Sequence, residues 1–206
     1  MTHIVSSISG YDKKRWKVTL DEGAVTFLLY KDEKKLLPEC GEEGAGPELS
    51  EEQYRYILEE VLLPRAKKRA LYYLKNADKT EFQIRRKLSE GFYPEEIIGK
   101  VMEFLKHYDF ADDRRYAENY IEAKQGALSK REMEMKLRQK GISGESVKEI
   151  LNEITAEDEY AACEKALRKK YTGDPRKDFA FLARKGYPFD AIEHAINTLH
   201  KENDNG

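Results

Sequence analysis

Three segments of the chain share one pattern: residues 82–92 read FQIRRKLSEGF, residues 132–142 read EMEMKLRQKGI, and residues 179–187 read FAFLARKGY. Each segment joins a basic stretch and a leucine to a glycine, and the glycines are separated by 50 and then 45 residues. Self-similarity at such a period is typical of repeat proteins, whose neighbouring units share apolar faces. The pattern therefore predicts three copies of one supersecondary unit.

Apolar residues return at the same offsets after each glycine. The matching sets are Ile97, Val147 and Ile192; Val101, Leu151 and Ile196; and Phe104, Ile154 and Leu199. This spacing predicts a helix on each side of the glycine, and the glycine itself is interpreted as a helix C-cap with a positive φ. Pro94 and Pro188 fit the start of the following helix, where a missing N–H costs nothing.

Each repeat is predicted to contain three helices. The expected bounds are 64–74, 80–90 and 94–107 in the first repeat; 112–125, 129–140 and 144–153 in the second; and 156–171, 175–185 and 188–201 in the third.

The start of the chain has a different composition. Residues 3–8, 15–20 and 24–30 are rich in β-branched and aromatic side chains and are separated by turn-forming residues, so they predict three strands. Residues 40–47 hold three glycines and a proline and are interpreted as a linker. Ser50 and Gln53 then form a capping box at the start of a helix, which Pro64 should end or restart.

We therefore expect a mainly α protein: three tandem three-helix repeats in an elongated curved array, preceded by a small N-terminal antiparallel β meander. The predicted segments are a β-rich segment 1–40, a linker 41–48, a leading helix 49–63, and repeats at 64–108, 109–155 and 156–203.

Composition limits the function. Charged residues make up 37% of the chain, but the net charge is −2 and the pI about 6.2, which is not the profile of a strongly basic DNA-coating protein. Cys40 and Cys163 lie far apart and are expected to be reduced thiols. The chain shows no signal-peptide pattern and no apolar run of the ~20 residues that span a membrane, so we expect a soluble, cytoplasmic protein.

Catalytic and metal-binding motifs are absent from the sequence. The four histidines form no HExxH or His–Cys cluster, and no P-loop, GxSxG or GxGxxG occurs. Asp112 and Asp113 can be considered as a metal pair, but their place at a helix start favours capping of free N–H groups. We expect neither enzymatic activity nor a cofactor.

Charge is distributed unevenly within each repeat. The helix after the turn is acidic, with Glu95 and Glu96, Glu145 and Glu149, or Asp190 and Glu193, so it is poorly suited to the major groove that a helix-turn-helix protein would read. The helix before the turn is basic, and parallel stacking of the repeats would line one face with positive charge. An ordinary solvated surface with i,i+4 pairs, such as Glu132 with Lys136, is the alternative. The candidate partner-binding or DNA-binding residues are Arg65, Lys67, Lys68, Arg85, Arg86, Lys87, Arg114, Arg131, Lys136, Arg138, Lys140 and Lys185.

Several stretches resemble the RecX regulatory family. Residues 110–117, FADDRRYA, resemble the family's [LF]-x-D-D-x-x-[FY]-A motif. Residues 70–74 and 79–88 resemble its A-x-x-x-L … R-[TS]-x-x-E-L-x-x-K-L run, with Lys79 in place of the usual arginine, and residues 131–141 resemble a second copy. The likeness covers about residues 64–199, the third repeat is the most divergent, and residues 1–37 lie outside the motifs.

The resemblance implies a function. RecX-like proteins bind RecA, lie in the groove of its filament on single-stranded DNA, and inhibit its ATPase and strand-exchange activities. For this chain, the resemblance implies that the RecA filament is the partner and that single-stranded DNA is reached through the filament. It also implies that the chain does not bind a membrane and that it is a monomer. Two alternatives stay open: a non-specific DNA-binding helical-repeat module without a RecA role, and an adaptor that binds protein only. For the first contact we favour Arg85, Arg86, Lys87, Lys136, Arg138 and Lys140.

Overall fold

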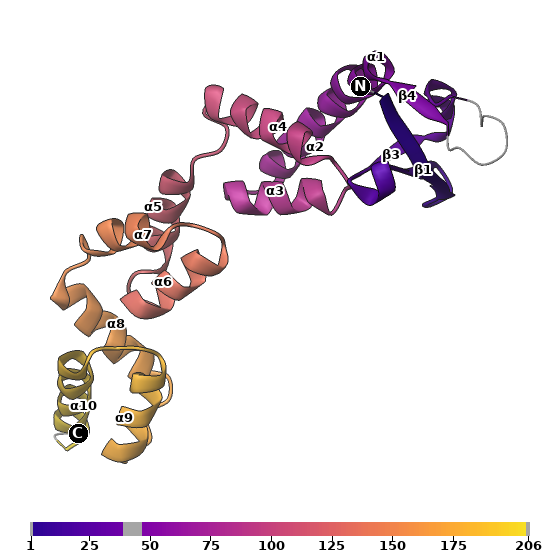
Figure 1. The fold of residues 1–206 in the computed structure, drawn as a ribbon. Helices are drawn as coiled ribbons and strands as arrows, with labels where there is room; N and C mark the ends of the chain where they lie inside the picture. Colours follow the sequence, from indigo (N-terminus) through magenta and orange to yellow (C-terminus); the bar gives the residue numbers. More distant parts are fainter. Residues whose placement is uncertain (1, 39–46, 205–206) are drawn as a thin grey trace. The chain divides into compact units, whose positions relative to one another are not determined.

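The computed structural model describes residues 2–38 and 47–204 and divides into two compact units, Met1–Ala111 and Asp112–Gly206. The mainly α fold with a small N-terminal antiparallel sheet is confirmed (Figure 1). The first unit holds the sheet and the first three-helix repeat, and the second unit holds the other two repeats.

The sheet contains the three predicted strands, β1 (Thr2–Gly10), β2 (Arg15–Leu20) and β3 (Val25–Tyr30), joined as an antiparallel meander. A fourth strand, β4 (Glu48–Ser50), pairs with the outer edge of β1 and gives the order β3-β2-β1-β4. Three residues are too few to show a strand period, so the sequence instead indicated the start of a helix here. Cys40 and linker residues 41–46 lie outside the described residues.

The leading helix begins at the predicted capping box. Ser50 Oγ accepts the N–H of Gln53, and the Gln53 side chain accepts the N–H of Ser50, which starts α1 (Glu51–Tyr56). Pro64 was expected to end or restart this helix, but the helix continues through a π-helical segment, η3 (Ile57–Leu62), into α2 (Leu63–Asn76). The wider i→i+5 turn leaves room for the proline ring and does not use the N–H that proline lacks.

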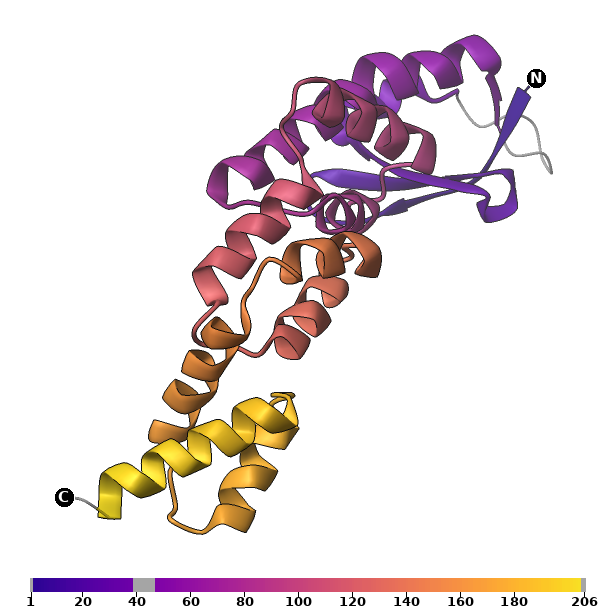
Figure 2. The same cartoon turned by 90° about the vertical axis from the view of Figure 1, so that its left-hand side faces the viewer.

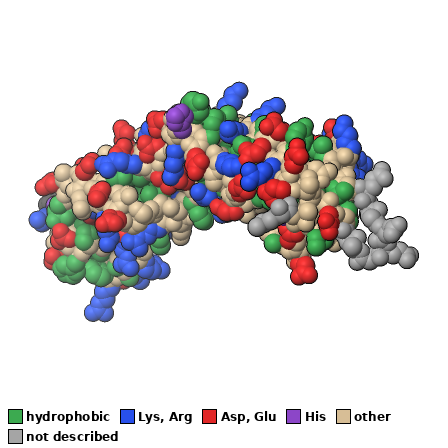
Figure 3. Space-filling model, turned by 45° about the horizontal axis from the view of Figure 1, so that its top comes forward, with side chains coloured by type: hydrophobic (Ala, Val, Ile, Leu, Met, Phe, Trp, Pro, Cys, Tyr) green, Lys and Arg blue, Asp and Glu red, His purple; other side chains and the backbone are tan. Residues whose placement is uncertain are grey.

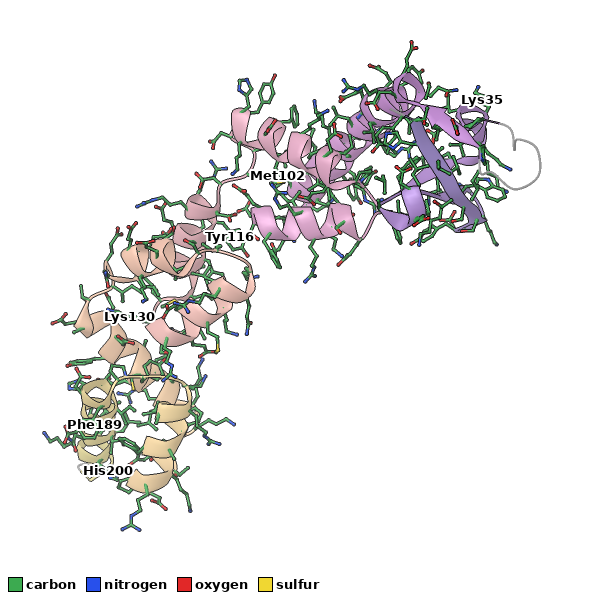
Figure 4. All side chains as sticks on the ribbon, in the orientation of Figure 1. Lys35, Met102, Tyr116, Lys130, Phe189 and His200 are labelled. Carbon is green, nitrogen blue, oxygen red and sulfur yellow. The ribbon has the colours of Figure 1, made fainter. Side chains whose placement is uncertain are left out.

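One hydrophobic core joins the sheet and the helices of the first unit. Phe27 and Leu29 of the sheet, Leu62 of η3 and Ile84 of the first repeat are fully buried in the same cluster. Figure 2 shows the strands and helices of this unit from a second side, and Figure 4 labels Met102, another member of its core. The β-rich start is therefore part of the same folded body as the first repeat.

All nine helices predicted for the repeats are present, with ends that differ from the predictions by a few residues. They are α2, α3 (Glu81–Ser89) and α4 (Glu95–His107); α5 (Asp113–Lys124), α6 (Lys130–Gln139) and α7 (Gly144–Leu151); and α8 (Ala156–Arg168), α9 (Pro175–Arg184) and α10 (Phe189–Asp204).

The three repeats have a common register, which the glycine marks in the second and third repeats but not in the first. The second helix of each repeat starts at an N-cap whose side chain accepts backbone N–H groups: Thr80, Ser129 and Asp174. Eight residues later a buried leucine accepts the N–H of the residue five positions on: Leu88, Leu137 and Leu182, each at 3.2–3.3 Å. The residue in the left-handed region is therefore Gly141 in the second repeat, Gly186 in the third, and Phe92 in the first.

This register corrects the glycine alignment in the first repeat. Gly91 has no positive φ, because it lies one residue closer to the N-cap Thr80 than Gly141 and Gly186 lie to theirs, and Phe92 takes φ 58° at the equivalent position. For a residue with a Cβ the left-handed region costs roughly 1–2 kcal/mol. Leu105, not Phe104, accordingly occupies the buried place that Ile154 and Leu199 take in the other repeats.

The second unit has two separate cores, one for each repeat. The second repeat packs around residues such as Met133 and Leu137, and the third around residues such as Leu182 and Ile192. Ser129 links them, because its hydroxyl donates to the carbonyl of Lys185 at 2.6 Å.

Candidate partner-binding surface

The second helix of each repeat is basic, as the sequence indicates, and in the second and third repeats it is the most basic of the three helices. In the first repeat α2 is more basic than α3, because it carries five lysines and arginines and no acidic residue. Residues 130–140, which contain α6, carry five lysines and arginines against two glutamates, and residues 144–151 of α7 carry one lysine against two glutamates. Cationic and anionic side chains are nevertheless interspersed over the face seen in Figure 3. Any positive surface is therefore local.

In the first unit most predicted cations have an acidic neighbour. Arg85 Nη1 lies 2.9 Å from Glu95 Oε1, which belongs to the acidic helix α4. Arg86 and Lys87 both pair with Glu90, at 3.3 and 2.7 Å. The predicted basic stretch of α3 is thus neutralised largely by its own repeat.

The cations of α2 are placed differently. Arg65 pairs with Glu33 and donates to the carbonyl of Leu28 at 3.0 Å, which ties α2 to the sheet. Lys67 Nζ lies 4.7 Å from the centre of the Phe104 ring. Lys68 is exposed and has no carboxylate partner among the described residues. Of these three residues, Lys68 has the charge most available to a partner.

In the second unit pairing is also common. Arg114 pairs with Glu118 at 2.8 Å, and Arg138 pairs with Glu134 at 2.7 Å. The predicted pairing of Lys136 with Glu132 is present at 3.8 Å, and Lys185 approaches the same glutamate at 3.8 Å from the third repeat. Lys140 lies within about 6 Å of the Tyr116 and Tyr120 rings.

Most of these pairs are exposed, and exposed pairs contribute only ~0–1 kcal/mol. They lower the local charge without fixing the side chains, so a partner with a better anion can displace them. The solvated-surface interpretation thus describes many of the predicted residues. Alignment of the basic helices of both units along one face stays a prediction.

One face of α6 combines free charge with an exposed apolar side chain. Arg131 is exposed and has no carboxylate partner in the described part of the chain. Arg138 lies seven residues further along α6 and lines the same shallow pocket. Met135 lies between them and is 54% exposed, whereas Met133 and Leu137 on the opposite side are buried. Unbranched Met side chains adapt to varied partners, so this face has the composition of a protein-binding surface.

A second candidate site is a cleft of about 590 Å³ in the first unit, between the sheet, α2 and the turn from α3 to α4. Its cationic lining is Arg15, Arg65, Lys68 and Arg69, and its aromatic lining includes Tyr30, Tyr72, Tyr73, Phe92 and Tyr93. None of the lining residues is acidic.

The rings of the cleft are held by the neighbouring cations. Arg69 Nε donates to Tyr73 Oη at 2.8 Å, and the Arg65 guanidinium lies 4.6 Å from the centre of the Tyr30 ring. Burial raises the pKa of Tyr93, while the positive charges of Arg65 and Arg69 oppose that rise. Among the cleft residues only Arg65 and Lys68 were predicted as functional. Arg15 and the rings were missed, because strand β2, strand β3 and the α3–α4 turn meet only in the fold.

The acidic pair at the start of α5 serves the helix. Asp112 acts as the predicted N-cap: it accepts the N–H groups of Arg114 and Arg115 at 2.8 and 3.1 Å. Within residues 2–38 and 47–204, no three His, Cys, Asp or Glu side chains gather in a way that could hold a metal ion. Over the same residues, no helix combines the length and the apolar composition needed to cross a bilayer.

Fold and surfaces together define a tandem three-helix repeat protein with local cationic surfaces. Comparison with known proteins identifies the family. Residues 66–105 match the model of the first RecX three-helix domain, and residues 112–151 match the second. The chain belongs to the RecX family.

Relatives support this assignment along most of the chain. The regulatory protein RecX of Clostridium acetobutylicum is 36% identical over 159 residues, 71% of this chain and 74% of the relative. That of Clostridium tetani is 31% identical over 202 residues, 91% and 89% of the two chains. A crystal structure of a regulatory protein RecX has the same fold, with a TM-score of 0.63, 24% identity, and coverage of 95% of this chain and 99% of the other. The structure of RecX from Lactobacillus salivarius has a TM-score of 0.58 and 23% identity, and the match covers 67% and 96% of the two chains.

Proposed function

We propose that this chain is a non-enzymatic, cytoplasmic regulator that binds the RecA filament on single-stranded DNA and restrains its ATPase and strand-exchange activities. The observation that carries the proposal is its similarity to proteins named as RecX regulators, which extends over most of the chain. The chain would act as a monomer and reach single-stranded DNA through the filament.

The α6 face is the proposed contact with the filament protein. Arg131 and Arg138 offer cations to acidic side chains of the partner, and Met135 offers an apolar anchor between them. Charge at the edge of such a contact steers association, while the buried apolar centre slows dissociation. Further weak contacts by α3 and by Lys185, the C-cap residue of α9, would add avidity, since successive filament subunits repeat the same surface.

The test is a titration of RecA that is hydrolysing ATP on single-stranded DNA. The wild-type chain should lower the hydrolysis rate at less than one chain per RecA. Arg131→Glu combined with Arg138→Glu should raise the half-inhibitory concentration by at least about tenfold, a change of ~1.4 kcal/mol in binding. The matched control is Lys169→Glu with Lys170→Glu, an equal charge reversal at two exposed lysines of the third repeat, and it should inhibit like wild type.

The outcomes separate this function from its alternatives. Absence of inhibition at equimolar wild-type protein would contradict the regulatory role. Tight binding to DNA without RecA, with a steep salt dependence and no effect on hydrolysis, would favour a non-specific DNA-binding module. Equal losses in both charge-reversed variants would show that total charge matters and the α6 face does not.

A further inference from the structure

We propose that the cleft of the first unit is a binding site for single-stranded nucleic acid, in which unpaired bases stack on tyrosine rings and the adjoining phosphates meet Lys68 and Arg69. The inference does not rest on the proposed regulation of RecA, because every residue that lines the cleft belongs to this chain and binding can be measured without RecA. Three features of the cleft support it: surplus positive charge, open aromatic faces, and an aromatic residue where the other repeats have glycine.

Positive charge in the cleft exceeds the negative charge near it. Arg15 pairs with Asp12 at 2.6 Å and Arg65 pairs with Glu33, so these two cations are largely compensated. Lys68 and Arg69 have no carboxylate partner among residues 2–38 and 47–204. Their charges are therefore available to phosphate oxygens.

The aromatic side chains leave ring surface open to a ligand. Tyr72 is 64% exposed and Tyr30 is 40% exposed, although both rings line the cleft. Tyr73 lies beside Tyr72, with 6.3 Å between ring centres, and Arg69 fixes its hydroxyl at 2.8 Å. Exposed rings next to cations are the combination on which proteins stack unpaired bases, because every base has a π face.

Phe92 adds a wall to the cleft at a backbone position that favours glycine. It takes φ 58° at the place where the second and third repeats have Gly141 and Gly186. Its ring meets the Tyr11 ring at 5.5 Å and lies under Lys17 Nζ at 4.9 Å. A side chain retained in the left-handed region is often explained by function, and here it completes the aromatic lining.

Single strands fit this cleft better than duplexes or acidic peptides. In a duplex the base faces are stacked on one another and cannot reach the tyrosines. An acidic peptide would use the cations but would leave the exposed rings unused. A free nucleotide also carries a base and a phosphate. Its single base, however, would leave most of the rings that line the cleft without a stacking partner.

The test measures anisotropy of a fluorescein-labelled oligothymidylate on the full chain without RecA. Tyr72→Ala should weaken binding by between about fivefold and about 150-fold, the range that corresponds to ~1–3 kcal/mol for one stacked base. The same variant should bind an abasic oligonucleotide of equal length as well as wild type does. Lys68→Gln should weaken binding to both oligonucleotides and reduce the salt slope by about 0.7, the value for one phosphate contact on a single strand.

Matched controls are Tyr56→Ala, an exposed tyrosine of α1 outside the cleft, and Lys75→Gln, a lysine further along α2. Both should bind like wild type, and circular dichroism should show every variant folded.

Equal wild-type affinity for thymidylate and abasic strands would overturn the proposal, as would unchanged binding by Tyr72→Ala. Competition by a polyglutamate peptide but not by unlabelled strand would assign the cleft to acidic protein segments. Displacement by thymidine monophosphate at lower concentration than by the strand would assign it to free nucleotides.

Discussion

The hydroxyl of Ser129 donates a 2.6 Å hydrogen bond to the backbone carbonyl of Lys185, 56 residues further along the chain. The same oxygen accepts the N–H of Glu132 at 3.1 Å and thereby caps α6. Ser129 is fully buried. One side chain therefore starts the basic helix of the second repeat and fixes the end of the corresponding helix in the third.

Replacing Ser129 with alanine should lower the free energy of unfolding by roughly 2–4 kcal/mol. The change removes an N-cap, worth ~1 kcal/mol, and takes the donor from a part-buried carbonyl, which costs ~1–3 kcal/mol. Urea denaturation measures the difference. Ser143→Ala is the matched control, because Ser143 caps α7 at an exposed position without a second partner in another repeat. It should cost only about 1 kcal/mol, and equal losses would contradict the linking role of Ser129.

The helices could be predicted because their apolar spacing and caps are local signals. The capping box at Ser50 and the N-cap at Asp112 are each contained within four residues, and the structure confirms both. The register of the first repeat could not be predicted in this way. Gly91 lies one residue before the left-handed position that Phe92 occupies, and only the backbone hydrogen bonds reveal the shift.

The candidate site was only partly predictable, for a related reason. Basic residues of one helix, such as Arg131 and Arg138, are visible as a run in the sequence. The cleft instead joins Arg15 of β2, Tyr72 of α2 and Phe92 of the α3–α4 turn. Their proximity depends on how the sheet packs on the helices, which no local pattern encodes.

Asp178 occupies an inward position that is apolar in the other two repeats. It is 1% exposed, four residues before Leu182, where the equivalent residues are Ile84 and Met133. Its Oδ1 accepts both the N–H and the hydroxyl of Thr172, at 3.1 and 2.8 Å. The buried carboxylate therefore holds the loop before α9, which an apolar residue could not do.

Asp178→Ala should lower the free energy of unfolding by about 1–3 kcal/mol, because both donors of Thr172 lose their acceptor. Asp178→Asn is the matched variant, since its amide oxygen can accept the same bonds, and it should stay within about 1 kcal/mol of wild type. Chemical denaturation of both variants measures the difference. An alanine variant as stable as the asparagine variant would show that these hydrogen bonds do not hold the loop.

The Cys163 thiol should resist modification until the second unit unfolds. Burial raises its pKa from 9.0 to about 12, which lowers the thiolate fraction at neutral pH roughly a thousandfold. Because the folded state keeps the proton longer than the unfolded state, stability is unaffected below pH 9 and falls as pH rises toward 12. Labelling with iodoacetamide in a Cys40→Ser background isolates this thiol. Fast labelling at pH 8 without denaturant would contradict its burial.

Gly186 should tolerate a side chain less well than Gly126, although both have a left-handed backbone. Their φ angles are 82° and 73°, so an alanine costs each roughly 1–2 kcal/mol from backbone strain alone. A Cβ on Gly126 would meet nothing within 4 Å, whereas one on Gly186 would lie 3.0 Å from Cδ of Arg131. Gly186→Ala must therefore also displace the stem of Arg131, on the α6 face proposed to contact RecA.

We expect Gly186→Ala to be the less stable of the two variants in thermal unfolding and to weaken inhibition of RecA, while Gly126→Ala inhibits like wild type. Equal melting temperatures and equal inhibition would mean that the Arg131 stem moves aside freely and that its position does not matter for binding.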